Sequence, residues 1–216
     1  NADCSEFPFN LKKMSVSGAL FDLTKLTDVS KNVISKMSAE KVLSYALDWA
    51  KNNDEKLFEL LSRDKEYSKA IFSIDRDVPK PRKDISKFSE IGHFVSFFFD
   101  ETFDSSLAEL PENLSKETTV KVLKAYASSY EEAADKNEWF EKMKELCEPL
   151  GFTPNVKEFK KNPESYLGHV GDVSTVVRVA VTGRRNTPDL YSIMMILGKE
   201  LVLKRLDAAI SALSED

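Results

Sequence analysis

The scarcity of glycine limits the folds open to this chain more than any other feature of its sequence. Only seven glycines occur among 216 residues, whereas charged residues make up 31%. A turn-rich β-sandwich or a dinucleotide-binding α/β fold needs more glycine, because many tight turns and phosphate loops require it. The composition therefore favours helices. We predict an all-α protein, long enough for one large domain or two small ones.

Apolar residues recur at helical spacing along most of the chain. Ser38 is a predicted helix N-cap, because its hydroxyl oxygen can accept a hydrogen bond from a free amide in the first turn. Gly151 suits the position just after a helix. The predicted apolar faces consist of Leu43, Ala46, Leu47 and Ala50; Phe88, Ile91, Val95 and Phe98; Val120, Leu123, Ala127 and Tyr130; Trp139, Met143, Leu146 and Leu150; and Leu203, Leu206, Ile210 and Leu213.

A polar stretch separates these helices into two groups. It covers residues 100–115 and contains Pro111. We predict a first helical unit over residues 37–112 and a second over residues 113–216. Before them, residues 1–36 have mixed periodicity and are predicted to form short segments and loops. Residues 152–170 are predicted to be irregular.

Two local signals near the end of the chain need interpretation. Propensity alone predicts a strand for Val173–Val181, because valine favours pleated structure. The run Thr187-Pro188-Asp189 is a strong helix start, with threonine as the N-cap, proline at the first helical position and an acid in the first turn.

The sequence offers little for catalysis. The histidines His93 and His169 are isolated, and the cysteines Cys4 and Cys147 lack metal-type spacing. No glycine-rich phosphate loop is present. We favour the interpretation of His93 as an ordinary packed or surface side chain without a catalytic role. We predict no catalytic residue and no metal site.

The overall charge and hydropathy suggest a location and exclude some partners. The net charge of −5 argues against a general nucleic-acid binder, although a local basic face could still bind one RNA. No apolar run is long enough to span a bilayer, and the cysteines do not form a disulfide framework. We expect a cytoplasmic monomer that binds neither DNA nor membrane. Because the chain begins at Asn1 rather than methionine, we also expect a processed or truncated product.

Basic residues gather in two places. One cluster surrounds the proline-containing loop of residues 75–84, which is predicted to be exposed. The other precedes the predicted helix start at Thr187. Arginine can grip phosphate, stack on a base or recognise a base edge, and a helix N-terminus can hold a phosphate. These clusters are typical of a modest RNA site or, alternatively, of ordinary solvated loops. They consist of Lys80, Arg82, Lys83 and Lys87, and of Arg178, Arg184 and Arg185.

Three motifs with matching spacing resemble a known family. They are Val177-Arg178-Val179-Ala180-Val181-Thr182-Gly183, Thr187-Pro188-Asp189-Leu190-Tyr191, and Leu197-Gly198-Lys199-Glu200 with Val202-Leu203 and Arg205-Leu206. This combination is similar to the closing part of bacterial-type glutamyl-tRNA synthetases, which are class I enzymes. The front of the chain also resembles the family, at Ser17, Phe21-Asp22-Leu23 and Lys25-Leu26. Asp28 and Ser30 depart from it, since the family usually has tryptophan and asparagine there.

Two short strings, Lys13–Ser17 and Lys36–Glu40, are similar to the KMSKS loop of class I synthetases, whose lysine stabilises the pyrophosphate of ATP. That loop acts beside a nucleotide-binding fold, and no βαβ pattern precedes either string. Both strings also lie downstream of where the loop would fall in the family. We interpret them as coincidental.

The resemblance implies two consecutive helical bundles, in which the valine-rich segment is helical. It implies that residues 1–36 are a short irregular or helical remnant of the segment that follows the catalytic domain and contacts the tRNA stem; the catalytic domain itself is missing. The parent enzyme would join glutamate to its tRNA with ATP and Mg²⁺. This portion would bind the anticodon arm of tRNA(Glu), without catalysis and without a cofactor of its own. The alternative is a helical protein–protein interaction module that does not bind RNA.

The resemblance also assigns residues one at a time. Arg178 matches an arginine that contacts anticodon bases, and Thr187 and Leu190 match residues that line the base pocket. Lys144 lies near a family arginine. Arg82 is our choice for the arginine that recognises the third anticodon base, although an ungapped alignment places Asp84 there. From the residues alone, we add Arg184, Arg185 and Lys83 as phosphate contacts.

Overall fold

The computed structural model describes residues 10, 12, 21–131 and 133–215. Within these residues it contains eleven α-helices and no β-strand, apart from one isolated parallel bridge between Thr153 and His169. The prediction of an all-α protein is therefore confirmed. The string Lys13–Ser17 lies outside the described residues. No helix in the described part combines the length and the apolar composition needed to cross a bilayer.

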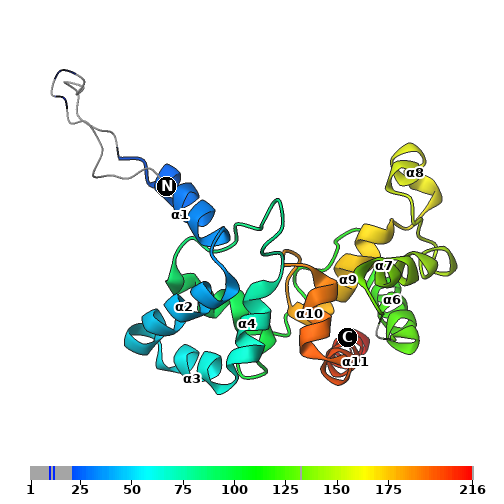
Figure 1. The fold of residues 1–216 in the computed structure, drawn as a ribbon. Helices are drawn as coiled ribbons and strands as arrows, with labels where there is room; N and C mark the ends of the chain where they lie inside the picture. The colour runs from blue at the N-terminus through cyan, green and yellow to red at the C-terminus, as the bar shows by residue number, and fades with distance from the viewer. Residues whose placement is uncertain (1–9, 11, 13–20, 132, 216) are drawn as a thin grey trace.

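The first half of the molecule consists of five helices, which lie together on the left in Figure 1. Aspartate or serine side chains cap the first four of them. The Ser38 cap is confirmed, because its Oγ accepts a hydrogen bond from the Lys41 amide at 3.3 Å. The helices are α1 (Leu23–Ser35), α2 (Ala39–Asn53), α3 (Glu55–Arg63), α4 (Lys65–Ser73) and α5 (Ile91–Val95).

Helix α1 corrects the expectation of short segments and loops before residue 37. It is a regular helix of 13 residues, and the Asp22 side chain accepts a hydrogen bond from the Lys25 amide at its start. Its mixed periodicity arises because several of its apolar side chains, including Leu26 and Val29, remain exposed. Periodicity is clear only where one face of a helix is buried.

The single helix expected over Phe88–Phe98 is also corrected. The segment consists of a 3₁₀ turn (Phe88–Glu90), α5, and a second 3₁₀ turn (Ser96–Phe98). Side chains from elsewhere take up carbonyls at its end: the Thr102 hydroxyl donates to the Ser96 carbonyl at 2.8 Å. The prediction that residues 97–99 belong to the core is confirmed, since these three phenylalanines are at most 7% exposed.

The second half consists of six helices, on the right in Figure 1. Helix α11 packs against α6, α9 and α10. Gly151 has a φ of 80°, in agreement with its predicted place after a helix. The helices are α6 (Lys116–Ser129), α7 (Lys136–Glu145), α8 (Val156–Lys161), α9 (Val170–Thr182), α10 (Leu190–Leu197) and α11 (Lys199–Ser214).

Residues 152–170 are more regular than predicted. They contain α8 and a 3₁₀ turn over Pro163–Ser165. The side chain of Asn155 explains the start of α8, because its Oδ1 accepts hydrogen bonds from the amides of Lys157 and Glu158. A short polar helix of this kind has no apolar periodicity by which a sequence could reveal it.

The valine-rich segment is helical, as the family resemblance implied and propensity did not. Within α9, Val173, Val176 and Val177 are fully buried. The helix also begins with a reciprocal cap, in which the Asp172 carboxylate accepts from the His169 amide at 2.9 Å. Burial of the valines and this cap outweigh the modest preference of valine for strands.

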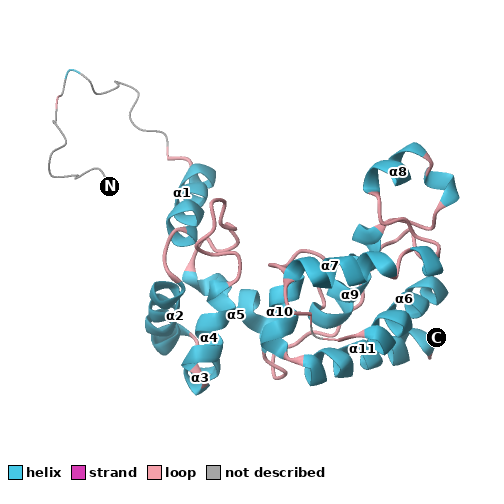
Figure 2. Ribbon diagram, turned by 45° about the vertical axis from the view of Figure 1, so that its right-hand side comes forward, coloured by secondary structure: helices cyan, strands magenta, loops and turns pink. Residues whose placement is uncertain are grey.

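In Figure 2, α5 of the first half and α10 of the second half lie in the middle of the molecule, where the two halves meet. Helix α10 packs against α4, and buried residues of both halves form one continuous core. Residues 99–115 link the halves without a helix. The boundaries at residues 37 and 113 remain predictions.

Candidate nucleic-acid interface

Arg178 lies on α9, and its guanidinium points to the segment between α9 and α10. Its Nη1 donates a hydrogen bond to the Pro188 carbonyl at 2.8 Å and a further hydrogen bond to the Thr187 hydroxyl. Burial lowers the pKa of Arg178; nearby Asp189 raises it, and Arg82 lowers it further. Arg178 is therefore a half-buried cation with a fixed orientation.

Thr187 contacts Arg178, but both Thr187 and Leu190, the two residues predicted to line the base pocket, are little exposed. Thr187 is 6% exposed and Leu190 is 1% exposed. The predicted helix start is shifted by two residues, since the N-cap is Asp189 and not Thr187. The carboxylate of Asp189 accepts hydrogen bonds from the amide and hydroxyl of Ser192 at 3.0 and 2.9 Å. The Thr187 hydroxyl instead interacts with Arg178.

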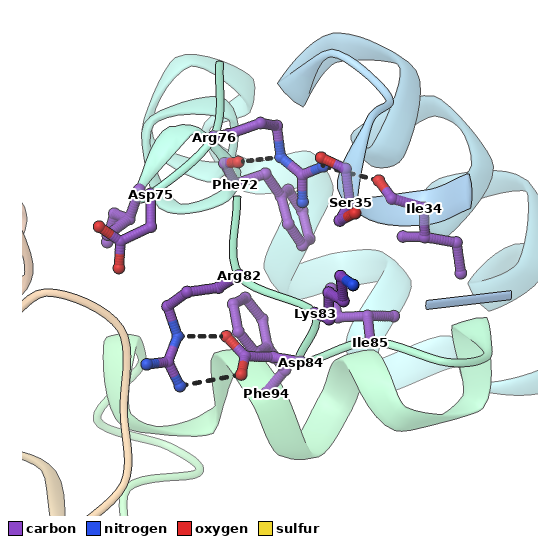
Figure 3. A pocket seen from close by; sticks show the side chains of 11 residues that line it. Ile34, Ser35, Phe72, Asp75, Arg76, Arg82, Lys83, Asp84, Ile85 and Phe94 are labelled. Carbon is purple, nitrogen blue, oxygen red and sulfur yellow. Dashed lines mark hydrogen bonds and ion pairs between the residues drawn. The ribbon is translucent and has the colours of Figure 1, made fainter. Parts of the chain in front are cut away.

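Arg82 reaches the same region from the first half. Its Nε and Nη2 form a two-point ion pair with the Asp84 carboxylate at 2.7 and 2.9 Å, as Figure 3 shows. Its Nη2 also donates to the Asn186 side-chain oxygen at 3.2 Å. The hydrogen bond from Arg82 to Asp84 raises the pKa of Arg82.

Hydrogen bonds from arginine side chains therefore hold part of the loop of residues 75–84, which was predicted to be exposed. Beside Arg82 in Figure 3, Arg76 donates through Nε to the Phe72 carbonyl at 2.7 Å and through Nη1 to the Ile34 carbonyl at 2.8 Å. Lys83 is exposed, as predicted for a loop residue.

A cleft of about 350 Å³ lies between the halves and brings several predicted residues together. Arg82, Thr187 and Arg184 line it, and Arg178 contacts its Thr187–Pro188 wall. Two phenylalanines provide apolar surface in the cleft. Its full lining is Arg82, Asp84, Glu90, His93, Phe94, Phe97, Arg184, Asn186, Thr187 and Pro188.

Arg184 and Arg185 contact protein groups across the two halves and the segment that links them. Arg184 donates to the His93 carbonyl and to the Ser96 hydroxyl, both at 2.8 Å. Arg185 donates to the carbonyls of Glu109 and Leu110 at 3.2 and 3.1 Å. Their role as phosphate contacts remains a prediction.

Lys144 is not part of this cleft. It lies on α7, where its Nζ pairs with Glu141 at 2.7 Å and lies 5.0 Å from the Phe140 ring centre. Both partners belong to the same helix, so Lys144 forms a separate basic position.

The sequence did not reveal several residues in the cleft and next to it. Asn186 carried no signal beyond its place between Arg185 and Thr187. Asp75 accepts a hydrogen bond from the Asp189 amide at 3.0 Å, although the two lie 114 positions apart. His93, predicted to be packed or at the surface, is exposed and lines the cleft. Only the fold brings such residues together. The described residues contain no group of three or more His, Cys, Asp or Glu side chains that could hold a metal ion.

Comparison with known proteins agrees with the sequence motifs. Residues 158–210 match the family model of the anticodon binding domain. The glutamate–tRNA ligase of Acetivibrio thermocellus is 44% identical over 206 residues, and that of Clostridium perfringens strain 13 is 45% identical over 209 residues. Each alignment covers 95% of this chain but only 38% of the ligase.

A solved structure is similar to the fold. The glutamate tRNA ligase of Elizabethkingia meningosepticum has a TM-score of 0.59 and 21% identity, over 95% of this chain and 35% of that one. This likeness supports the fold alone. The chain spans little more than a third of the length of these relatives. The chain is similar to part of the glutamate–tRNA ligases, and its residues 158–210 match the anticodon binding domain.

Proposed function

We propose that this chain recognises the anticodon arm of tRNA(Glu). The observation that carries the proposal is the meeting of Arg82, from the first half, and Arg178, from the second half, at one cleft between them. Anticodon bases are unpaired, so their edges and faces are open to side chains. Two cations beside a cleft that also offers the rings of Phe94 and Phe97 suit such bases.

In this proposal, Arg178 contacts a base edge. Its orientation is set by the Thr187 hydroxyl and the Pro188 carbonyl, so little side-chain entropy is lost on binding. Thr187 lines the cleft, whereas Leu190, which the family resemblance also assigns to the base pocket, is 1% exposed and is not among the residues that line it. Arg82 recognises the third base.

Other basic residues would contact the RNA backbone. Lys83 is exposed next to Arg82, and Lys144 offers a basic position on α7. For Arg184 and Arg185, a phosphate contact would require sharing their guanidinium groups with the protein carbonyls that they already hold. Backbone contacts of this kind add affinity without base specificity.

The whole protein would be a glutamate–tRNA ligase that joins glutamate to tRNA(Glu) with ATP and Mg²⁺. We assign that chemistry to the part of the relatives' length that this chain does not span. The chain itself would act as a monomer in the cytoplasm, without a cofactor and without DNA or a membrane as partner.

Binding of the chain to an RNA stem-loop with the tRNA(Glu) anticodon tests this function. Fluorescence anisotropy at several salt concentrations should show affinity that falls as salt rises. Arg178→Ala should cost about 1–3 kcal/mol of binding free energy. The matched control is Arg63→Ala, which removes an exposed arginine on α3 that pairs with Glu101 and lies outside the cleft. Equal binding by Arg178→Ala and the parent chain would refute the role of Arg178. Absence of any salt-dependent binding would favour the protein–protein module.

A further inference from the structure

Two arginines of the second half contact the same short segment of the first half. Arg184, which follows α9, donates to the His93 carbonyl and the Ser96 hydroxyl. Arg205, on α11, donates to the Phe97 carbonyl at 2.7 Å and to the Asp100 carboxylate at 3.1 Å. Residues 93–100 therefore accept hydrogen bonds from the guanidinium groups of both arginines.

Two of the acceptors are carbonyls of the broken helix, those of His93, which also accepts from the Ser96 amide, and of Phe97. Residues 88–98 form three short turns instead of one long helix. Carbonyls at the end of a helix have no partner within it and carry partial negative charge. A guanidinium suits such carbonyls because it presents several donors in a fixed plane.

The contacts of Arg205 do more than fill space in the core, because they favour one relative orientation of the two halves. Arg205 is 4% exposed, and its Nη1 also donates to the Val181 carbonyl of α9 at 2.8 Å. Its guanidinium carbon lies 3.8 Å from the centre of the Phe103 ring. Burying a charge costs free energy that a well-packed apolar side chain would not. The charge is held by groups of both halves, so it favours one relative orientation of them.

That orientation determines the candidate site. The segment that carries Arg184 also carries Asn186 and Thr187, and Asn186 contacts Arg82 at 3.2 Å. If the halves turned relative to each other, Arg82 would move away from the wall that Arg178 contacts. A displacement of about 1 Å can cost a large factor where several groups must act together.

We infer that Arg205 and Arg184 are positioning residues, which fix the two halves so that Arg82 and Arg178 face one anticodon at the same time. The part of this inference that concerns RNA rests on the proposed function. The part that concerns the fixed orientation of the two halves does not. Neither arginine needs to touch RNA to have this effect. Preorganisation of this kind raises affinity because less order has to be imposed on binding.

The test variant is Arg205→Met, which retains a long side chain without donors. Its matched control is Lys204→Met, the adjacent exposed cation, which also contacts Asp100 at 3.4 Å. The distance between the halves is measured in a chain that carries Cys4→Ser. Spin labels are placed at two exposed positions, Glu59 on α3 and Lys124 on α6. Double electron–electron resonance gives the distribution of that distance, and anisotropy gives the affinity for the tRNA(Glu) stem-loop.

We expect Arg205→Met to broaden the distance distribution and to weaken RNA binding about tenfold, with little loss of helical circular dichroism. Lys204→Met should change neither. If Arg205→Met does not fold, Arg184→Gln gives the same distance measurement on the second arginine. A distribution as narrow as that of the parent chain in the folded variant would overturn the inference. If the parent chain binds no RNA, the proposed function fails, and the distance distribution still decides the fixed orientation.

Discussion

The carboxylate of Asp84 holds the guanidinium of Arg82 at two points, with Nε–Oδ2 and Nη2–Oδ1 distances of 2.7 and 2.9 Å. These are the two residues that compete for the position of the third-base reader in the sequence alignment. The structure places them side by side at the edge of the cleft. A bidentate pair of this kind fixes the plane of the guanidinium but also neutralises its charge.

Asp84→Asn should therefore strengthen RNA binding. The substitution removes a negative charge near the phosphates and leaves Arg82 unneutralised, so we expect the affinity to rise by about 0.3–1 kcal/mol at low salt, the range of partly exposed ion pairs. Titration of the stem-loop at low and high salt measures the change, which should shrink as salt rises. Weaker binding by Asp84→Asn would mean that the carboxylate itself contacts the RNA.

A substitution at Gly183 tests the contact between the end of α9 and the segment that links the two halves. Its φ is 72°, and a Cβ there would lie 2.2 Å from the Asp104 carbonyl oxygen. Gly183→Ala should therefore lose stability both through the left-handed backbone, about 1–2 kcal/mol, and through displacement of the backbone at Asp104. Urea denaturation measures the loss in the free energy of unfolding.

Gly198→Ala is the matched control for this prediction. Gly198 has a φ of 78°, but no atom lies within 4 Å of the position that a Cβ would take there. Its ψ of 155° lies outside the left-handed helical region, in a region that almost only glycine adopts, so this variant should show a backbone cost of about 1–3 kcal/mol and no contact cost. A loss in Gly183→Ala no larger than the left-handed backbone cost of about 1–2 kcal/mol would show that residue 104 does not restrict residue 183.

The periodicity of the sequence predicted most helices, and the places where it failed have physical causes. Helix α1 leaves apolar side chains exposed and α8 is short and polar, so neither has the buried face that creates a period. The segment Phe88–Phe98 forms short turns, and two of its carbonyls, those of His93 and Phe97, accept hydrogen bonds from Arg184 and Arg205, which come from a distant part of the chain. Long-range hydrogen bonds of this kind leave no local pattern.

Some contacts of the candidate site could also be predicted from the sequence, and others could not. Arg178 and Thr187 lie nine positions apart, and the family resemblance assigned both to the anticodon site. The contact between Arg82 and Asn186 spans 104 positions, and no spacing rule connects them. Arg184 was predicted from its charge, but its protein partners could not be predicted, because charge alone does not distinguish a phosphate from a carbonyl.

Asp189 should make stability depend on pH. Burial raises the pKa of its carboxyl, but the hydrogen bonds from Lys136 and Ser192 outweigh burial, so the pKa is lowered from the ordinary 3.8. A lowered pKa in the folded state adds stability above the unfolded pKa, and this contribution is lost as pH falls through the folded value. Asp189→Asn retains an N-cap side chain but loses the charge. It should cost about 1 kcal/mol at pH 7, and the difference should shrink below about pH 4. Urea denaturation of both proteins at pH 7 and pH 3 checks this, and a constant difference would contradict it.

Arg82 should determine which base is accepted at the third anticodon position. The genetic code places cytosine there for glutamate and guanine for glutamine. Arginine only donates hydrogen bonds, so a contact to the Watson–Crick edge suits the adjacent acceptors of cytosine better than the adjacent donors of guanine. The parent chain should bind a stem-loop ending its anticodon in cytosine more tightly than one ending in guanine. Arg82→Ala should remove about 1–3 kcal/mol of this preference. Lys83→Ala, at the exposed neighbour, should instead weaken both complexes alike and lower the salt dependence by about one ion. If Arg82→Ala also weakens both complexes equally, Arg82 binds the backbone, and the third base is recognised by another residue.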